Sequence, residues 1–303
     1  MSHLEYTVIV PVYKSVETLQ PLFDGIDKCM SELNLTFEVL YIEDSGSEES
    51  WNELLRLKTA HPEYVRIIRL SRNFGQNSAT LCGIDESIGR KIITIDDDLQ
   101  TPPSEMAKMI AFQKETGADV VYAKYSENKT YWFRRSGSKL LKRLFKKSDS
   151  GSIGSSFRLI DTHIVDHLRF HAQDHLFINQ VISWYTLNAQ YIEVDHNERV
   201  SGKSGYSFFR LVWMSLRLIM YYTSIPIKIM IALSILTAIG IAIMTVYYVF
   251  YQINTGRAVD LFMVSVLLAM AVISASISVF GVYINRIYSA RVKKPNYAIK
   301  VKM

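Results

Sequence analysis

Two unlike patterns of hydrophobic and polar positions divide the 303-residue chain. Up to about residue 200, short apolar runs alternate with amphipathic stretches, as in a soluble domain. From 225 to 287 the chain is almost purely apolar, and neither 229–252 nor 261–284 contains a charged residue. A helix of about 20 residues crosses the hydrocarbon core of a bilayer. The pattern therefore predicts a C-terminal transmembrane hairpin with spans at about 229–252 and 261–284.

The first 200 residues predict an α/β domain. Runs rich in β-branched residues predict strands, and these lie at 7–12, 37–42, 65–70, 91–95 and 118–123. Between them, helix-forming stretches lie at 16–33, 49–59, 78–87 and 105–114. Alternating strands and helices predict a mostly parallel sheet flanked by helices. In such sheets, ligands bind at the carboxyl ends of the strands.

Polar motifs follow four of these strands, at 11–13, 43–47, 71–75 and 96–100. Because carboxyl ends of parallel strands share one edge, the motifs predict a ligand site there. The chain has no G-x-G-x-x-G, G-x-x-x-x-G-K-S or G-x-S-x-G motif. A dinucleotide-binding dehydrogenase, a P-loop phosphotransferase and an α/β-hydrolase are therefore disfavoured.

The most informative motif is the acidic run Asp96-Asp97-Asp98. Three adjacent carboxylates repel one another, and Mg²⁺ or Mn²⁺ would offset this because hard cations prefer oxygen ligands. Strand alternation would put Asp96, Asp98 and Gln100 on the metal side and Asp97 on the other. The metal would take up negative charge on a leaving diphosphate. The alternative is an exposed acidic turn that caps the next helix.

Basic residues lie near the apolar stretches, in a chain of net charge +5. The second stretch is followed by six of them: Arg286, Arg291, Lys293, Lys294, Lys300 and Lys302. This bias predicts that both flanks, and the N-terminal domain, are cytoplasmic. Two amphipathic helices are predicted, a basic one at 131–147 and an interfacial one at 206–223, both suited to an anionic membrane surface. A solvated cationic helix or a nucleic-acid patch is the alternative for 131–147, but we expect no nucleic-acid partner.

The first residues and the two cysteines allow two further predictions, about a signal peptide and about disulfides. Residues 1–6 are short and polar, so no cleavable signal peptide is expected. Cys29 and Cys82 belong to no C-x-x-C pair and are expected to be buried free thiols. The predicted organisation is a catalytic domain at 1–205, the interfacial helix, the hairpin at 225–287 and a cytoplasmic tail at 288–303.

Taken in order, these motifs resemble the family-2 inverting glycosyltransferases with the GT-A fold. Within that group the chain is similar to polyprenyl-phosphate glycosyltransferases, especially the bactoprenol glucosyltransferases and the undecaprenyl-phosphate aminoarabinose transferases. Dolichol-phosphate mannose synthase is more distant. The resemblance covers nearly the whole chain and rests on segments 10–13, 43–44, 70–76, 96–103, 132–134, 157–159, 199–206 and 281–283, with Arg286 and Tyr288.

The resemblance implies metal-dependent transfer of a sugar, with inversion, from a nucleotide-sugar to a polyprenyl phosphate. The donor would be a UDP-sugar, the acceptor an undecaprenyl-type phosphate at the cytoplasmic membrane face, and the product part of a cell-envelope glycan. Some relatives are tetramers, so a homo-oligomer is possible. The resemblance also implies residue roles. Pro11, Tyr13 and Asp44 would hold the base and ribose of the donor, and Asp97 would support the metal residues Asp96, Asp98 and Gln100. The residues near the phosphates of donor and acceptor would be Arg134, Arg199, Lys203 and Ser204. Asp98, Arg134 and Arg199 would be the catalytic residues.

The chain departs from the family pattern twice. Ser45 is an extra residue in the turn after the second strand, and 151–156 lacks the carboxylate that usually precedes Phe157-Arg158-Leu159. A phosphate monoester has a second pKa near about 6, so the acceptor needs positioning more than deprotonation, and we name no general base. Two alternatives stay open: a membrane-tethered, non-catalytic nucleotide-sugar binder, and a processive polysaccharide synthase. A single hairpin and the lack of Q-x-x-R-W disfavour the synthase.

Overall fold

The computed structural model describes residues 4–125, 155–169, 178–195, 197, 225–255, 261–292 and 295–303. The chain divides into two compact units. The first combines Met1–Lys203 with Lys294–Met303, and the second is Ser204–Lys293. The predicted helices at 131–147 and 206–223 lie outside the described residues.

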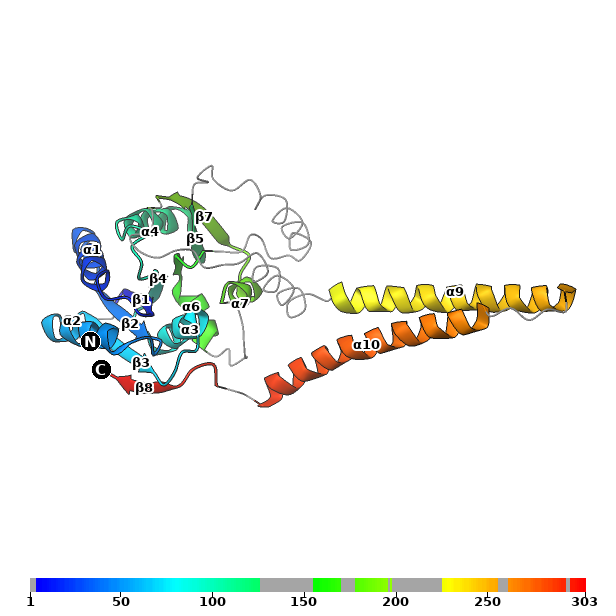
Figure 1. Ribbon diagram of the computed structural model, residues 1–303. Coiled ribbons are helices and arrows are strands. Elements are labelled where there is room, and N and C mark those ends of the chain that lie inside the picture. The colour runs from blue at the N-terminus through cyan, green and yellow to red at the C-terminus, as the bar shows by residue number, and fades with distance from the viewer. Residues whose placement is uncertain are drawn as a thin grey trace. The chain divides into compact units, whose positions relative to one another are not determined.

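The first unit is built on an eight-stranded sheet with the order β7-β5-β6-β4-β1-β2-β3-β8 (Figure 1). Strands β6 and β8 are antiparallel to their neighbours, and the other strands run parallel. The strands are β1 (Tyr6–Val12), β2 (Phe37–Glu43), β3 (Val65–Leu70), β4 (Lys91–Thr94), β5 (Val120–Tyr125), β6 (Arg158–Ile160), β7 (Ala189–Val194) and β8 (Ile299–Lys302).

Helices cover both faces of the sheet. Helices α1 (Leu19–Glu32), α2 (Glu48–Ala60) and α4 (Glu105–Thr116) pack on one face, and α3 (Gln76–Glu86), α6 (Thr162–Arg169) and α7 (Ile178–Tyr185) on the other. Along β2, Val39 and Tyr41 join the first core cluster, and Leu40 and Ile42 join the second. A central strand that is apolar on both faces is typical of a parallel sheet covered by helices. The predicted fold class is therefore confirmed.

The five predicted strands and four predicted helices are all present, with small changes at their ends. The first helix begins at Leu19 rather than 16, and the third begins at Gln76 rather than 78. Strands β6, β7 and β8 were not predicted. Cys29 and Cys82 are buried free thiols, as expected.

The structure differs from the predicted tail at 288–303. Residues up to Val292 continue a helix, and Ile299–Lys302 form strand β8, which pairs with β3. Val301 packs against the first core cluster. An edge strand such as β3 has unpaired N–H and C=O groups, and β8 satisfies them. The segment is therefore part of the first unit's sheet.

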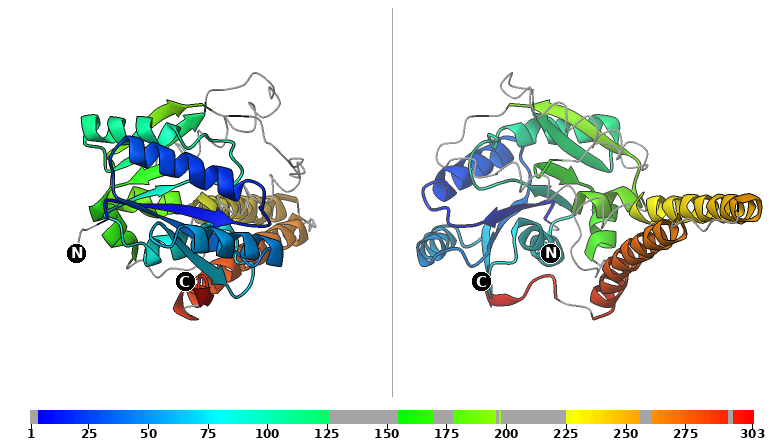
Figure 2. Two further views of the ribbon diagram at one scale, coloured as in Figure 1. Left: turned by 90° about the vertical axis from the view of Figure 1, so that its left-hand side faces the viewer. Right: turned by 45° about the vertical axis from the view of Figure 1, so that its right-hand side comes forward.

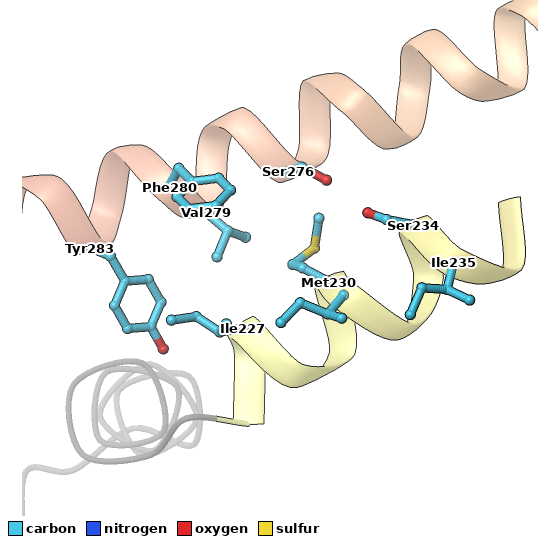
Figure 3. Close-up of a pocket in the computed structure, with 9 residues that line it drawn as sticks. Ile227, Met230, Ser234, Ile235, Ser276, Val279, Phe280 and Tyr283 are labelled. Carbon is cyan, nitrogen blue, oxygen red and sulfur yellow. The ribbon is translucent and has the colours of Figure 1, made fainter. Parts of the chain in front are cut away.

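The second unit contains two long apolar helices, α9 (Ile225–Thr255) and α10 (Leu261–Val292), which lie side by side (Figure 2). Within them, Ile227–Asn254 and Leu268–Asn285 are long and apolar enough to cross a membrane. The pair fits the predicted hairpin. A cavity of about 240 Å³ separates the helices, and Ser234 and Ser276 point into it among apolar neighbours (Figure 3).

Candidate functional site

The loops at the carboxyl ends of β1, β2 and β4 each contain a residue other than glycine with a left-handed backbone. These are Lys14, Ser45 and Leu99, with φ of 63°, 51° and 57°. Gly75, after β3, has φ of 91°. Such conformations cost about 1–3 kcal/mol each outside glycine, and they concentrate at functional sites. Asn34, which lies before β2, is the other positive-φ residue of this kind among those described, and asparagine adopts this conformation readily.

Asp96 is held by two side chains that the sequence motifs did not assign. Gln76 donates from Nε2 to Asp96 Oδ1 at 2.6 Å, and Ser156 donates from Oγ to Oδ2 at 2.7 Å. Gln76 is the first residue of α3, and Ser156 lies just before β6. Burial raises the pKa of Asp96. The site therefore joins three loops around one carboxylate.

Asp97 faces a different partner. The backbone N–H of Tyr13 donates to Asp97 Oδ2 at 3.2 Å, which ties the loop after β4 to the loop after β1. Burial raises the pKa of Asp97 to about 6. Asp98 accepts from the backbone N–H of Gln100 at 3.2 Å. The alternation used in the sequence prediction does not apply here, because β4 ends at Thr94 and the acidic residues lie in the turn that follows.

The acidic turn fits a divalent cation only as a partial site. Among the described residues, no three His, Cys, Asp or Glu side chains converge as a complete set of metal ligands. Mg²⁺, however, is commonly bound by one or two carboxylates, with phosphate oxygens and waters in the other positions. A cation would also offset the cost of burying Asp96 and Asp97 as anions. Asp96 and Asp98 can serve such a site, and the backbone C=O of Gln100 accepts from Asn197 at 2.7 Å nearby.

Asp44 holds the loop after β3. Its two carboxylate oxygens accept from the backbone N–H groups of Phe74 and Gly75, each at 2.7 Å, and the residue is 3% exposed. Burial raises the pKa of Asp44, against the effect of these two bonds. The predicted contact with base or ribose is not tested by this arrangement. Asp44 has a structural role at the rim that the sequence did not suggest.

Pro11 and Tyr13 were also predicted to hold the nucleoside. Pro11 is the last residue but one of β1, and Tyr13 is the first residue after it. The Tyr13 side chain is 48% exposed at the rim. Glu43 supports the neighbouring turn, because its Oε1 accepts from the N–H groups of Gly46 and Ser47. Gly46 lies so close that a Cβ there would be 2.7 Å from Lys14 N. The turns after β1 and β2 are thus packed together.

Two buried arginines were also missed by the sequence predictions. Arg69 on β3 pairs with Glu43 at 3.0 Å and with Glu48 at 2.6 Å. Arg158 on β6 donates to Asn179, is 4% exposed, and carries a positive charge that partly opposes the rise in the pKa of Asp96 caused by burial. The Phe-Arg-Leu motif contained Arg158, but only the fold reveals that its charge acts on the acidic turn.

Four predicted site residues cannot be placed. Arg134, Arg199, Lys203 and Ser204 lie outside the described residues, so their contacts with phosphate stay predictions.

Solved structures share this fold at low sequence identity. The mannosyltransferase PcManGT from Pyrobaculum calidifontis, in complex with GDP-Man and Mn²⁺, is 13% identical over 91% of this chain and 87% of its own, with a TM-score of 0.50. Glucosyl-3-phosphoglycerate synthase from Mycobacterium tuberculosis, with Mn²⁺, UDP and phosphoglyceric acid, is 11% identical over 72% and 76%, also at 0.50. TarS 1–349 from S. aureus, with UDP-GlcNAc, is 16% identical over 72% of this chain at 0.46, and the match spans 66% of TarS 1–349.

A family model matches the part of the chain that builds the rim. The model describes glycosyl transferase family 2, and it matches residues 7–168, more than half of the 303 residues. This range contains β1 to β6 and the acidic turn. The eight-stranded, mostly parallel sheet with helices on both faces is the GT-A fold that the family uses. The chain belongs to glycosyl transferase family 2.

Proposed function

We propose that the chain transfers a sugar from a nucleotide-sugar to a polyprenyl phosphate, with inversion and with the help of Mg²⁺ or Mn²⁺. The observation that carries the proposal is the acidic turn 96–98 at the rim of a family-2 domain, in a chain that also has two long apolar helices. We place the reaction at the cytoplasmic face of the inner membrane.

The donor half of the proposal is supported by structures of the same fold that hold GDP-Man with Mn²⁺ or UDP with Mn²⁺. A cation bound through Asp96 and Asp98, with Gln100 near it, would neutralise charge on the departing nucleoside diphosphate. The resemblance to undecaprenyl-phosphate enzymes favours UDP. The exposed ring of Tyr13 is available for the base.

The chain's own residues fix the geometry of the rim before the donor arrives. Asp97 ties the Tyr13 loop to the acidic turn, and Asp44 holds the loop 71–75. Because these loops are already ordered, less conformational entropy is lost when the donor binds, and its phosphates are presented in one orientation.

The acceptor half rests on the hairpin and on basic residues outside the described range. A lipid phosphate is largely a dianion at neutral pH, so it needs cations that position it. Arg134, Arg199, Lys203 and Ser204 are proposed for this task. The positive residues that flank the helices favour a cytoplasmic catalytic unit and a multi-pass topology. A homo-oligomer, tetrameric by resemblance, belongs to the same proposal.

The test is a transfer assay on membranes that contain the full chain, with Mn²⁺, undecaprenyl phosphate and a panel of labelled UDP- and GDP-sugars. We expect one donor to give a labelled lipid, EDTA to abolish the product, and added Mn²⁺ to restore it. Asp98→Ala should abolish it too. Asp166→Ala removes an exposed carboxylate on α6 and should leave it unchanged. If no donor labels the lipid while a related enzyme succeeds alongside, the proposal is wrong.

One observation favours a second candidate, a non-catalytic nucleotide-sugar binder. Where relatives usually have a carboxylate, this chain has Ser156, and its hydroxyl is bonded to Asp96. A binder would keep its cellular role after Asp98→Ala as long as the protein still folds, whereas an enzyme would lose it. The size of the labelled product separates single transfer from a processive synthase.

A further inference from the structure

Helix α3 is contacted at both ends by groups from other parts of the chain. At its first residue, Gln76 donates to Asp96 in the acidic turn. At its other end, the Tyr297 hydroxyl donates to Asp85 Oδ2 at 2.7 Å, and Lys302 pairs with Glu86. The two ends are about 15 Å apart, from the rise of an α-helix. The segment 297–303 therefore contacts a helix whose other end lies in the candidate site.

The same segment also fixes the start of the loop 71–75. Ser71, the first residue after β3, donates its backbone N–H to the C=O of Ala298 at 2.8 Å. Phe74 and Tyr297 both pack against the core cluster that α3 helps to form. The loop is thus held by segment 297–303 at its beginning and by Asp44 at its end.

Strand β8 pairs with β3 in a defined register, so the segment 297–303 has a fixed position on the sheet. Ile67 and Met303 exchange two backbone hydrogen bonds at 3.0 Å, at the other end of the pairing from Ser71. Gly83 brings α3 so close to β1 that a Cβ there would overlap Ile9. This contact sets how closely α3 approaches the sheet, and the contacts at its two ends add to the side-chain packing that sets its position along the rim.

We propose that Tyr297 and strand β8 are positioning elements for the donor nucleotide, because they hold the loop 71–75 and helix α3 against the acidic turn. This inference rests on the proposed function only for the existence of a nucleotide donor. It needs no assumption about the acceptor. It gives the segment after the second apolar helix a role in the family-2 site.

The experiment measures nucleotide binding by the full chain in detergent, with UDP and with GDP, each in the presence of Mn²⁺. Tyr297→Phe removes only the hydroxyl. We expect its Kd for the bound nucleotide to rise about threefold to tenfold, the range that one lost hydrogen bond accounts for. Asp85→Asn keeps an acceptor oxygen for Tyr297 and should keep Kd within about twofold of wild type, whereas Asp85→Ala should match Tyr297→Phe.

A control separates positioning from general loss of stability. Thr186→Val also removes a hydroxyl that donates to a carboxylate, that of Asp119, but it lies beside β5, toward the other edge of the sheet from β3 and β8. It should lower Tm and leave Kd unchanged. In a double-mutant cycle, Tyr297→Phe and Asp44→Asn should be non-additive in Kd, because both act on the loop 71–75.

These measurements distinguish failure of this inference from failure of the proposed function. An unchanged Kd in Tyr297→Phe, or an equal loss in Thr186→Val, would overturn this inference and leave the proposed function standing. Additive effects of Tyr297→Phe and Asp44→Asn would overturn it as well. If the wild-type chain bound neither UDP nor GDP, the nucleotide-sugar proposal would fail, and this inference with it.

Discussion

The substitution Asp44→Asn tests how the rim is held together. In the wild-type chain, two carboxylate oxygens accept from two backbone N–H groups, those of Phe74 and Gly75. Asparagine offers one acceptor oxygen and one NH₂ group, which is a donor. One of the two N–H groups would then lose its partner and face another donor, in a place where Asp44 is 3% exposed.

The expected cost follows from this geometry. A hydrogen bond to a charged group contributes about 1.5–3 kcal/mol, and an unsatisfied buried donor costs about 1–3 kcal/mol. Some relaxation of the exposed part of the loop reduces the loss, so we expect about 2 kcal/mol. For a unit of this size, that is a fall in Tm of roughly 4–8 °C. Because the displaced loop leads directly into Gln76, the nucleotide Kd should also rise, by about tenfold.

Two measurements on the full chain check this: thermal unfolding, and titration with UDP or GDP in Mn²⁺. Asp119→Asn is the control, because Asp119 is a carboxylate that also accepts a hydrogen bond, from Thr186 Oγ1, and it lies beside β5, away from β3 and the loop 71–75. It should lower Tm without changing Kd. If Asp44→Asn weakened nucleotide binding but left Tm unchanged, the role as a loop clamp would be refuted in favour of direct contact with the donor.

Three further predictions concern single residues. Burial raises the pKa of Asp85 to about 6, above its unfolded value of about 4, so the folded state retains a proton that the unfolded state releases and stability falls as pH rises through this window. Asp85→Asn should therefore raise Tm at pH 8 and not at pH 4; a difference in Tm that is independent of pH would contradict this. Gly46→Ala would place a Cβ 2.7 Å from Lys14 N, so a loss of about 1–3 kcal/mol in thermal unfolding and a higher nucleotide Kd are expected, and wild-type values for both would count against close packing of the two turns. Gly75→Ala and Gly117→Ala both force alanine into positive φ and should each cost about 1–2 kcal/mol, but only Gly75→Ala should raise Kd.

The elements of the fold were predictable where the signal is local. Strands β1 to β5 are runs of β-branched and apolar residues bounded by polar turns, and β2 is buried along its whole length. Their alternation with helices is sufficient to predict a parallel sheet. Strands β6, β7 and β8 contain no long β-branched run, and each forms by pairing with a strand far away in the chain.

The candidate site was predictable as an edge of the sheet and less so as a set of contacts. The polar ends of β1 to β4 do meet, because parallel strands end on the same side. The partners of Asp96 were not predictable, because Gln76 and Ser156 are 20 and 60 residues away and meet it only in the folded chain. The strand alternation used for the acidic run assumes an extended strand, whereas β4 ends before the run, at Thr94.

Strand β8 also sets the order in which the molecule can be completed during synthesis. The ribosome makes β3 early, and both apolar helices are made before residues 299–302. Until those residues emerge, the outer edge of β3 keeps its N–H and C=O groups unpaired, and such an edge can pair with another chain. A chain that stalls after β3 and before residues 299–302 would therefore expose an aggregation-prone edge, and mutations in α9 or α10 that cause such stalling would lower the yield of the first unit.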